Sequence, residues 1–328
     1  MRAFRRFAES LPAAASAALL CLAVGMARAQ ADSVVRVGKG FSGVFDFVPV
    51  DVGLAQGFFK KHGLDVKEFD FNGSAKYQQA LAADGIDIGL GSGVELAYVA
   101  KGAPDLAVAV LMGPPADLTL FTRKGAGLDA LSNLKGKRIS VSTVASLTEW
   151  LVQELSRQQG WGTHGIVTVP LGARQAQVSV LRTGQTDGMA IDFIGGTMLQ
   201  NDGLGRIILH FDKVEPDFIT HAAFARTAFI KEHPAELRGF LAGWFETIAY
   251  MRKHKAETVS IAAKALQEPA DIVATDYDAT MPAFSDNGQF EEKPLAVLGR
   301  SFIDMGLLDK APDMKALYTE KFLPKPRS

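Results

Sequence analysis

Short apolar runs alternate with amphipathic segments along most of the chain, and the alternation occurs twice in the same order. The first copy spans residues 34 to 110 and begins with the strand-like segment Val35 to Val37. The second spans residues 137 to 209 and begins with Ile139 to Val141. Apolar runs that alternate with helical segments are typical of parallel strands covered by helices on both faces. The pattern therefore predicts two α/β lobes.

Glycines punctuate the two copies at matching places. Gly73 precedes Gly85 by twelve residues, and Gly172 precedes Gly184 by the same number. Glycines at fixed offsets mark turns between the same elements in each copy. We interpret the chain as a duplicated α/β unit, in which a small molecule is expected to bind between the copies.

Two β-like segments flank the second copy, at residues 117 to 123 and 218 to 224. They are expected to be the crossings out to the second lobe and back. This gives a first lobe of residues 33–118 and 222–328 and an inserted second lobe of residues 119–221. The remaining C-terminal chain has helical periodicity and is expected to pack on the first lobe.

The first 29 residues have the features of a secretory signal. Three arginines precede the uncharged apolar stretch Leu11 to Met26, and Ala27-Arg28-Ala29 supplies small residues for cleavage after Ala29. The stretch is too short for a typical spanning helix. Cys21 has no small residue before it, which argues against lipid attachment. Export to the periplasm is predicted, with the choice between the general and the twin-arginine route left open.

Charge and cysteine content exclude several classes of protein. Removal of residues 1 to 29 takes away four basic residues and one acidic residue, which leaves a net charge of −4. An acidic surface argues against nucleic acid as a partner. The only cysteine leaves with the signal, so neither a disulfide nor a thiol nucleophile is expected.

Motifs for catalysis or metal binding are missing from the sequence. The six histidines are scattered without metal-ligand spacing, and Ser42 and Ser92 lie in glycine loops that do not have the G-x-S-x-G spacing. The run Lys135-Gly136-Lys137 lacks the glycines and hydroxyl of a phosphate-binding loop. We therefore expect no enzyme activity, no metal and no cofactor.

Small and polar residues gather where predicted strands end and helices begin. At these ends, unpaired backbone N–H groups and glycines let a ligand approach the main chain. Ordinary turns and helix caps use the same residue types, so the joint occurrence in both copies carries the argument. The candidate ligand contacts are Phe41, Ser42, Phe45, Asp46, Asn72, Gly73, Ser74, Gly91, Ser92, Thr143, Ala145, Ser146, Thr148, Arg174, Asp192 and Phe193.

Three phrases of the sequence carry a resemblance to a known family. They are Gly57-Phe58-Phe59-Lys60-Lys61-His62-Gly63-Leu64-Asp65-Val66, Leu131-Ser132-Asn133-Leu134-Lys135-Gly136-Lys137 and Gly184-Gln185-Thr186-Asp187-Gly188. In these the chain resembles the substrate-binding proteins of ABC importers for nitrate, sulfonate, taurine and thiamine-pyrimidine precursors. Asp84-Gly85 departs from the family at a turn. The resemblance implies the type II periplasmic binding-protein fold, with two doubly wound lobes joined by a two-crossing hinge.

The resemblance also implies a function. A monomeric protein would capture a small organic solute (sulfonate, carboxylate or heterocycle) by closing its lobes and would then dock on the membrane permease of an importer. Phe41, Phe45, Phe193 and Trp150 are candidates for flat contacts, although core packing is the alternative for each. Arg174 is the candidate partner for an anion, whereas inward-pointing Asp46, Glu95, Glu149 and Asp192 would favour an amine or a heterocycle. A sensor subunit and a pyrimidine synthase are the alternatives.

Overall fold

The computed structural model describes residues 32–71 and 73–325, without the side chains of Ser74 and Ala75. The predicted signal peptide and its cleavage site lie outside this range. From Asp32 onward the chain forms one compact unit, so the lobe boundaries expected from the sequence stay a prediction. No helix in the described ranges combines the length and apolar character needed to span a bilayer.

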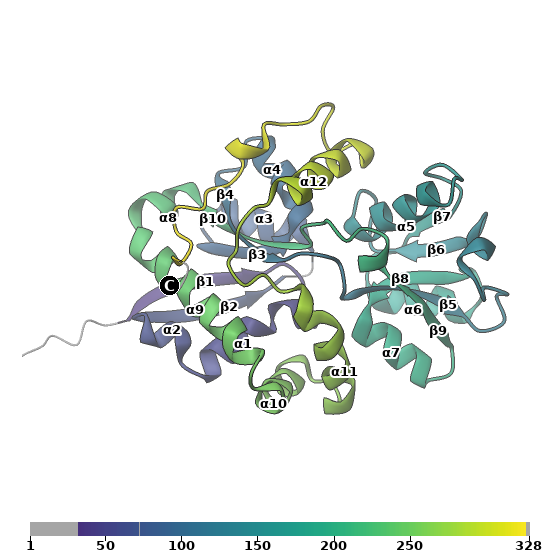
Figure 1. The fold of residues 1–328 in the computed structure, drawn as a ribbon, viewed down its shortest axis with the longest axis horizontal. Coiled ribbons are helices and arrows are strands. Elements are labelled where there is room, and N and C mark those ends of the chain that lie inside the picture. Colours follow the sequence, from purple (N-terminus) through teal and green to yellow (C-terminus); the bar gives the residue numbers. More distant parts are fainter. Residues whose placement is uncertain (1–31, 72, 326–328) are drawn as a thin grey trace, which may run out of the picture. The chain divides into compact units, whose positions relative to one another are not determined.

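The strands form two sheets of five strands each (Figure 1). The first sheet contains, in spatial order, β2 (Leu64–Asp70), β1 (Ser33–Lys39), β3 (Ile88–Ser92), β10 (His221–Arg226) and β4 (Asp105–Met112). The second sheet contains β7 (Val167–Pro170), β6 (Arg138–Val141), β8 (Gly188–Asp192), β5 (Leu118–Arg123) and β9 (Gly205–His210).

Both sheets are mixed, which corrects the expectation of purely parallel sheets. β1 runs parallel to β2 and β3, whereas β10 runs antiparallel to β3 and β4. β6 likewise runs parallel to β7 and β8, and β5 runs antiparallel to β8 and β9. The antiparallel strands are the two predicted crossing segments. Each runs against its neighbours because it enters its sheet from the other repeat instead of through a helix of its own.

The two repeats therefore build sheets of the same strand order, and each sheet takes one strand from the segment that follows the other repeat. β1, β2, β3 and β4 match β6, β7, β8 and β9 in spatial order, while β10 and β5 take equivalent places. The matching glycines have matching roles. The Gly73 N–H donates to the Gly40 carbonyl at 3.0 Å, and the Gly172 N–H donates to the Ser142 carbonyl at 2.6 Å.

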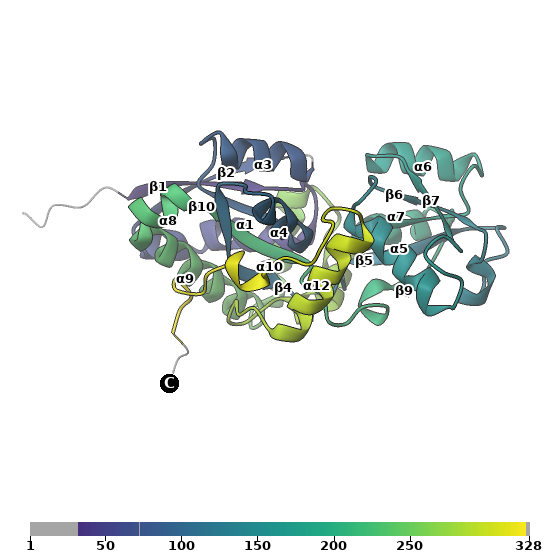
Figure 2. The ribbon, with the colours of Figure 1, turned by 90° about the horizontal axis from the view of Figure 1, so that it is seen from above.

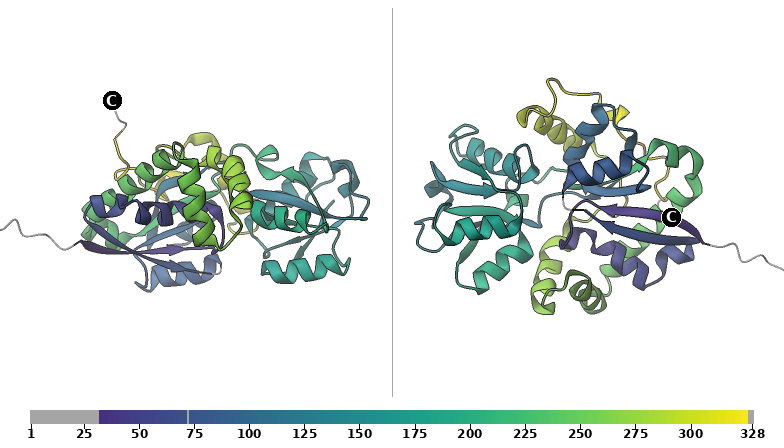
Figure 3. Two further views of the ribbon diagram at one scale, coloured as in Figure 1. Left: turned by 90° about the horizontal axis from the view of Figure 1, so that it is seen from below. Right: turned by 180° about the vertical axis from the view of Figure 1, so that it is seen from behind.

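Helices cover both faces of the first sheet. Figures 2 and 3 show α3 (Ser74–Ala82) on one face and α1 (Val48–Ala55), α9 (Pro234–Met251) and α10 (Lys255–Leu266) on the other. Side chains of α9 pack with those of β1 in one core cluster.

The other helices are α2 (Phe58–Lys61), α4 (Leu96–Ala100), α5 (Leu147–Gln158), α6 (Arg174–Arg182), α7 (Phe193–Asn201), α8 (Thr227–Glu232), α11 (Ala270–Thr280) and α12 (Glu292–Asp304). Short 3-10 turns lie at η1 (Phe45–Phe47), η2 (Gly93–Glu95), η3 (Leu131–Leu134), η4 (Phe211–Lys213), η5 (Met281–Ala283) and η6 (Met314–Ala316).

The last long helix, α12, contacts both repeats, which the sequence did not predict. Its residues Leu298 and Phe302 share a core cluster with Trp150 of α5. The Trp150 Nε1 donates to Asp304 Oδ2 at 3.2 Å, and Arg300 lies 3.2 Å from Glu215. α12 thus joins the C-terminal region to the second repeat as well as to the first.

Candidate functional site

The strand-end loops of the first repeat meet at the carboxyl ends of β1 and β3. The Gly40 N–H donates to the Leu90 carbonyl at 2.8 Å, and the bond from Gly73 to Gly40 joins the next loop. Phe41 is half-buried and Ser42 is exposed. Asn72 lies outside the described residues. A ligand could therefore reach the loop that follows β1.

The hydroxyls of the second repeat are engaged in capping α5. The Glu149 N–H donates to Ser146 Oγ at 3.3 Å, and the Ala145 N–H donates to Glu149 Oε2 at 2.7 Å, a variant of the capping box in which Glu149 reaches the residue before the N-cap. Thr148 Oγ1 accepts a 3.1 Å bond from the Ser142 N–H. Among the candidate residues of this loop, Thr143 is the exposed one. Ser146, Thr148 and Glu149 thus have structural partners, and their contact with a solute stays a prediction.

Arg174, the candidate partner for an anion, is already paired with a carboxylate. Its Nη2 lies 2.7 Å from Asp192 Oδ2. The second oxygen of Asp192 accepts the Gly195 N–H at 2.8 Å and so caps α7. An anionic solute at Arg174 would have to compete with Asp192, a charge-assisted partner in direct contact.

The candidate aromatic residues divide between core and cavity. Phe45 is 2% exposed and packs edge-on against Tyr277 and Phe284 in the core. Trp150 is fully buried and stacks on Phe218. Phe193 lies at the start of α7, where its ring faces the His210 ring at 5.2 Å between centroids.

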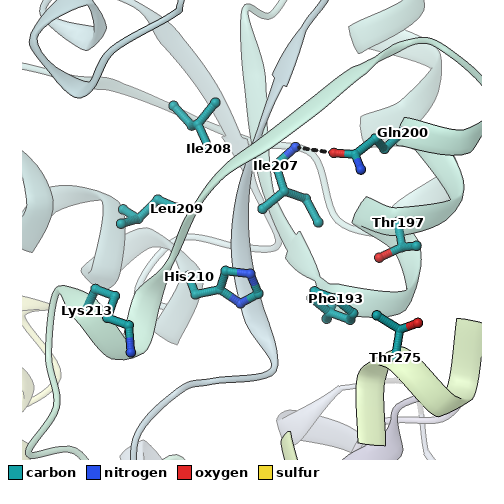
Figure 4. Close-up of a pocket in the computed structure, with 9 residues that line it drawn as sticks. All are labelled: Phe193, Thr197, Gln200, Ile207, Ile208, Leu209, His210, Lys213 and Thr275. Carbon is teal, nitrogen blue, oxygen red and sulfur yellow. Dashed lines mark hydrogen bonds between the residues drawn. The ribbon is translucent and has the colours of Figure 1, made fainter. Parts of the chain in front are cut away.

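Phe193 and His210 line a cavity of about 460 Å³ (Figure 4). Most of its wall comes from α7 and β9, and Thr275 of α11 closes one side. The size falls in the range of cavities that hold small organic ligands. The remaining lining residues are Thr197, Gln200, Ile207, Ile208, Leu209 and Lys213.

A second polar feature lies where the crossings leave and enter the first sheet. Asp46 follows β1, Asp117 precedes β5, and His221 begins β10. One ligand-type atom from each of the three side chains lies within 4.8 Å of the other two, and all three residues are buried. Asp46 was a candidate from the sequence, whereas Asp117 and His221 were missed. Their places at the starts of the two crossing strands are the signal that could have identified them.

Burial and like charges dominate the electrostatics around this cluster. Burial, and then the nearby Asp46, Asp276 and Asp192 carboxylates, raise the pKa of Asp117 well above its usual range. Burial also raises the pKa of Asp276, although a hydrogen bond from Thr280 opposes the rise. No lysine or arginine of the described chain pairs with Asp46, Asp117 or Asp276. This part of the site therefore disfavours a negative ligand.

The close packing at Gly91, near the end of β3, supports the same region from the first repeat. A side-chain carbon at Gly91 would lie 2.1 Å from Glu95 Oε2 and 2.8 Å from the Tyr77 ring. The Gly91 carbonyl accepts a 3.2 Å hydrogen bond from His221 Nδ1. Ser92 beside it is 4% exposed, and its hydroxyl has no partner within the described residues. Gly91 and Ser92, at the end of β3, thus lie beside His221 and the cluster that it forms with Asp46 and Asp117.

Comparison with protein families gives one match over most of the chain. The sequence model described as NMT1/THI5 like matches residues 44–258. Among curated proteins, 4-amino-5-hydroxymethyl-2-methylpyrimidine phosphate synthase THI13 of Saccharomyces cerevisiae is 24% identical over 208 residues. The match covers 59% of this chain and 60% of that protein, so the chain spans only about three-fifths of the length of this relative.

Comparison with solved structures identifies the fold. The periplasmic aliphatic sulphonate binding protein SsuA from Escherichia coli superposes with a TM-score of 0.75 at 18% identity, covering 88% of this chain and 92% of its own. The periplasmic nitrate-binding protein NrtA from Synechocystis PCC 6803 gives a TM-score of 0.68 at 14% identity, covering 88% and 87%. The predicted periplasmic binding-protein fold is confirmed by these similarities.

Proposed function

The chain belongs to the NMT1/THI5-like family, and we propose that it is a periplasmic solute-binding protein that delivers a small organic molecule to an ABC importer. The exchange of strands between the two sheets carries this proposal. Each sheet includes one strand from the segment that follows the other repeat, so two crossings link the repeats. Two sheets linked in this way can rotate relative to each other about the crossings, as in a hinge motion, while their strands stay paired.

Capture and delivery follow from such a hinge. The strand-end loops of each repeat supply backbone groups, and the cavity at Phe193 has room for an organic group. A solute that touches both repeats stabilises the closed arrangement relative to the open one. The closed protein then presents a surface that a permease recognises, which couples import to the presence of solute.

We propose further that the solute is neutral or carries an amine, in preference to a sulfonate or a nitrate ion. Arg174 is engaged by Asp192 at 2.7 Å. Burial and neighbouring carboxylates, Asp46 and Asp192 among them, raise the pKa of both Asp117 and Asp276, so this region already disfavours negative charge. An anion entering this region would meet carboxylates without a free guanidinium to hold it. A heterocycle with hydrogen-bond donors meets acceptors instead.

A thermal unfolding screen with matched compounds tests this proposal. The compounds are an alkanesulfonate, the amine with the same carbon skeleton and a neutral aminopyrimidine, each measured in the presence of a metal chelator. A true ligand at about a hundred times its dissociation constant adds roughly 2.7 kcal/mol of stability. We expect the shift from the amine or the aminopyrimidine. A shift caused by the sulfonate alone would contradict the proposed charge preference.

A synthase activity is the second candidate, because the yeast relatives are named as pyrimidine phosphate synthases. The described residues contain no cysteine, and the single cysteine of the chain is Cys21 in the predicted signal. This supports the binding function over covalent thiol chemistry. The two candidates differ in one measurable outcome, since a binding protein returns its ligand chemically unchanged.

A further inference from the structure

Three buried acceptor side chains converge on one point at the crossings. Asp46 is 2% exposed, Asp117 is 5% exposed and His221 is 6% exposed. Asp46 Oδ2 lies 3.4 Å from His221 Nε2, and the three ligand-type atoms lie within 4.8 Å of one another. Polar atoms this deeply buried need a partner, because desolvation is costly when no bond replaces water.

The hydrogen bond at Nδ1 of the His221 ring determines whether Nε2, which faces Asp46, carries a proton. His221 Nδ1 lies 3.2 Å from the Gly91 carbonyl, which can only accept, so Nδ1 carries the proton. In the neutral ring, Nε2 then presents a lone pair toward the Asp46 carboxylate. A histidine that binds a metal through one nitrogen commonly donates its other N–H to a backbone carbonyl in this way.

The outer carboxylate oxygens provide an independent sign of a missing partner. Asp46 Oδ1 and Asp117 Oδ1 are both buried, and neither has a hydrogen-bond partner among the described residues. A proton placed on His221 Nε2 would serve Asp46 Oδ2 but would leave these oxygens unsatisfied. A cation among the three side chains would serve both carboxylates and the imidazole together.

The surroundings favour a single ion over an organic cation. None of the three residues lines the cavity of about 460 Å³. The Phe47 ring also packs against the imidazole at 5.0 Å between centroids, which leaves an apolar wall on that side. We propose that Asp46, Asp117 and His221 bind a divalent transition-metal ion of the zinc class.

The choice of ion follows from the ligand atoms. One imidazole nitrogen and two carboxylates suit zinc, which binds three protein ligands and keeps one open position. Calcium takes six to eight oxygens, and magnesium keeps several waters, so both suit this compact mixed set poorly. A dication would balance the charges of Asp46 and Asp117 and would add no net positive charge to attract an anion. The preference for a neutral or amine solute therefore persists in the loaded protein.

The ion would join three segments that already meet through packing, hydrogen bonds and the contact between Asp46 and His221. Asp46 follows the first strand of the first sheet, Asp117 lies on the outgoing crossing and His221 lies on the returning crossing. The crossings are already bonded, since Thr220 Oγ1 donates to the Gly113 carbonyl at 2.6 Å. The ion would hold this bonded pair to the loop after β1 and so stiffen the base of the hinge.

Equilibrium dialysis of the exported, chelator-treated protein against Zn²⁺, without organic solute, tests the site. We expect one Zn²⁺ per chain. Asp117→Asn and His221→Gln each should lower the affinity by at least about 100-fold, because loss of a mere supporting group already costs 10- to 100-fold. His233→Gln is the matched control, since His233 also lies near a carboxylate, 3.5 Å from Glu236, but on the surface. It should leave the affinity unchanged.

A Co²⁺ spectrum of the unmutated protein covers the case in which a variant fails to fold. Intense visible bands of four- or five-coordinate Co²⁺, displaced by one equivalent of Zn²⁺, would support the site. The site is ruled out if the unmutated protein retains no Zn²⁺, or if folded Asp117→Asn and His221→Gln proteins bind it as tightly as the unmutated one. The zinc test contains no solute, so a failure to bind Zn²⁺ leaves the solute-binding proposal standing. The solute screen contains a chelator, so a failure to bind solute there leaves the zinc site standing.

Discussion

Asp87 and Asp187 occupy equivalent positions in the two sheets but differ in their partners. Asp87 Oδ2 accepts a 2.9 Å hydrogen bond from the Arg36 backbone N–H in the first sheet. Asp187 Oδ2 accepts one of the same length from the Arg138 backbone N–H in the second sheet. Asp87 also pairs with the side chains of Arg36 at 2.6 Å and Arg226 at 2.9 Å. No ion pair to Asp187 occurs within the described ranges. The two repeats thus share the hydrogen bond from the backbone to the aspartate, but only the aspartate of the first repeat also has arginine side chains as partners in the described chain.

Replacing each aspartate by alanine should expose this difference. Asp87→Ala removes the acceptor of two guanidinium groups and should cost about 3 kcal/mol, because breaking a buried ion pair leaves its partners uncompensated. Asp187→Ala removes one hydrogen bond and should cost about 1 kcal/mol. Urea unfolding at neutral pH measures both. Equal costs would show that the arginines contribute nothing.

The stabilisation by Asp87 should also depend on pH. Burial alone would raise the pKa of Asp87, but hydrogen bonds from Arg36 and Arg226 outweigh it and lower the pKa. A carboxyl with a lowered folded pKa stabilises the protein above its unfolded pKa of about 4, and this stabilisation is lost as the pH falls through the folded value. The difference between Asp87→Ala and the unmutated protein should therefore shrink below about pH 4. A difference that grows on acidification would contradict the ion pairs.

Asp105 should behave in the opposite way. It is 2% exposed at the start of β4, and burial raises its pKa to about 6. A raised folded pKa penalises the ionised form, so Asp105 weakens the fold as the pH rises from about 4 to 6. Asp105→Asn should add up to about 3 kcal/mol at neutral pH and little at pH 4. Unfolding curves at the two pH values provide the check, and a variant that is less stable at both would refute the pKa assignment.

Gly93 allows the returning crossing to pack closely on the first repeat. A side-chain carbon there would lie 2.0 Å from the Ile219 carbonyl oxygen, and the Gly93 N–H donates to the Thr220 carbonyl at 2.9 Å. Gly93→Ala should therefore displace the crossing and cost about 2 kcal/mol or more, as overpacking does. The control is Gly113→Ala on the outgoing crossing, where the nearest atoms lie 3.8 Å away. Thermal unfolding should show a loss only for Gly93→Ala.

Phe193 should contribute to solute binding as well as to folding. Phe193→Ala enlarges the cavity and removes its aromatic wall, so the solute affinity should fall at least about tenfold, which is 1.4 kcal/mol. Leu181→Ala is the matched control, because Leu181 is fully buried in the second repeat and does not line the cavity. Both changes should cost about 3 kcal/mol of stability. Calorimetric titration with the solute should show weakened binding for Phe193→Ala alone.

Much of the fold could be predicted from the sequence because it depends on local patterns. Strand-like segments such as Val35 to Val37 and the glycines at positions 73 and 172 mark elements by spacing alone. The antiparallel direction of β5 and β10 could not be predicted, because it depends on which strands they pair with in the sheet they enter. The second contact of α12 was missed for a similar reason, since its apolar face does not indicate that Trp150 is among its partners.

The candidate site residues taken from the sequence stay a prediction, and the contacts between them could not be derived from the sequence. Asp46 and Phe193 were named as candidates because they follow strands, where ligands bind in this class of sheet. Arg174 was proposed as a free cation, but its pairing with Asp192 joins residues 18 apart and could not be inferred from spacing. Asp117 and His221 are 104 residues apart in the chain, so only the folded crossings bring them to Asp46.

Native mass spectrometry of the protein isolated from the periplasm of its host tests the central claim most directly. A solute-binding protein should carry one small organic molecule per chain, which dissociates on denaturation and is recovered chemically unchanged after prolonged incubation. A chain that holds no such molecule, or that converts it into a product, would contradict the proposed function.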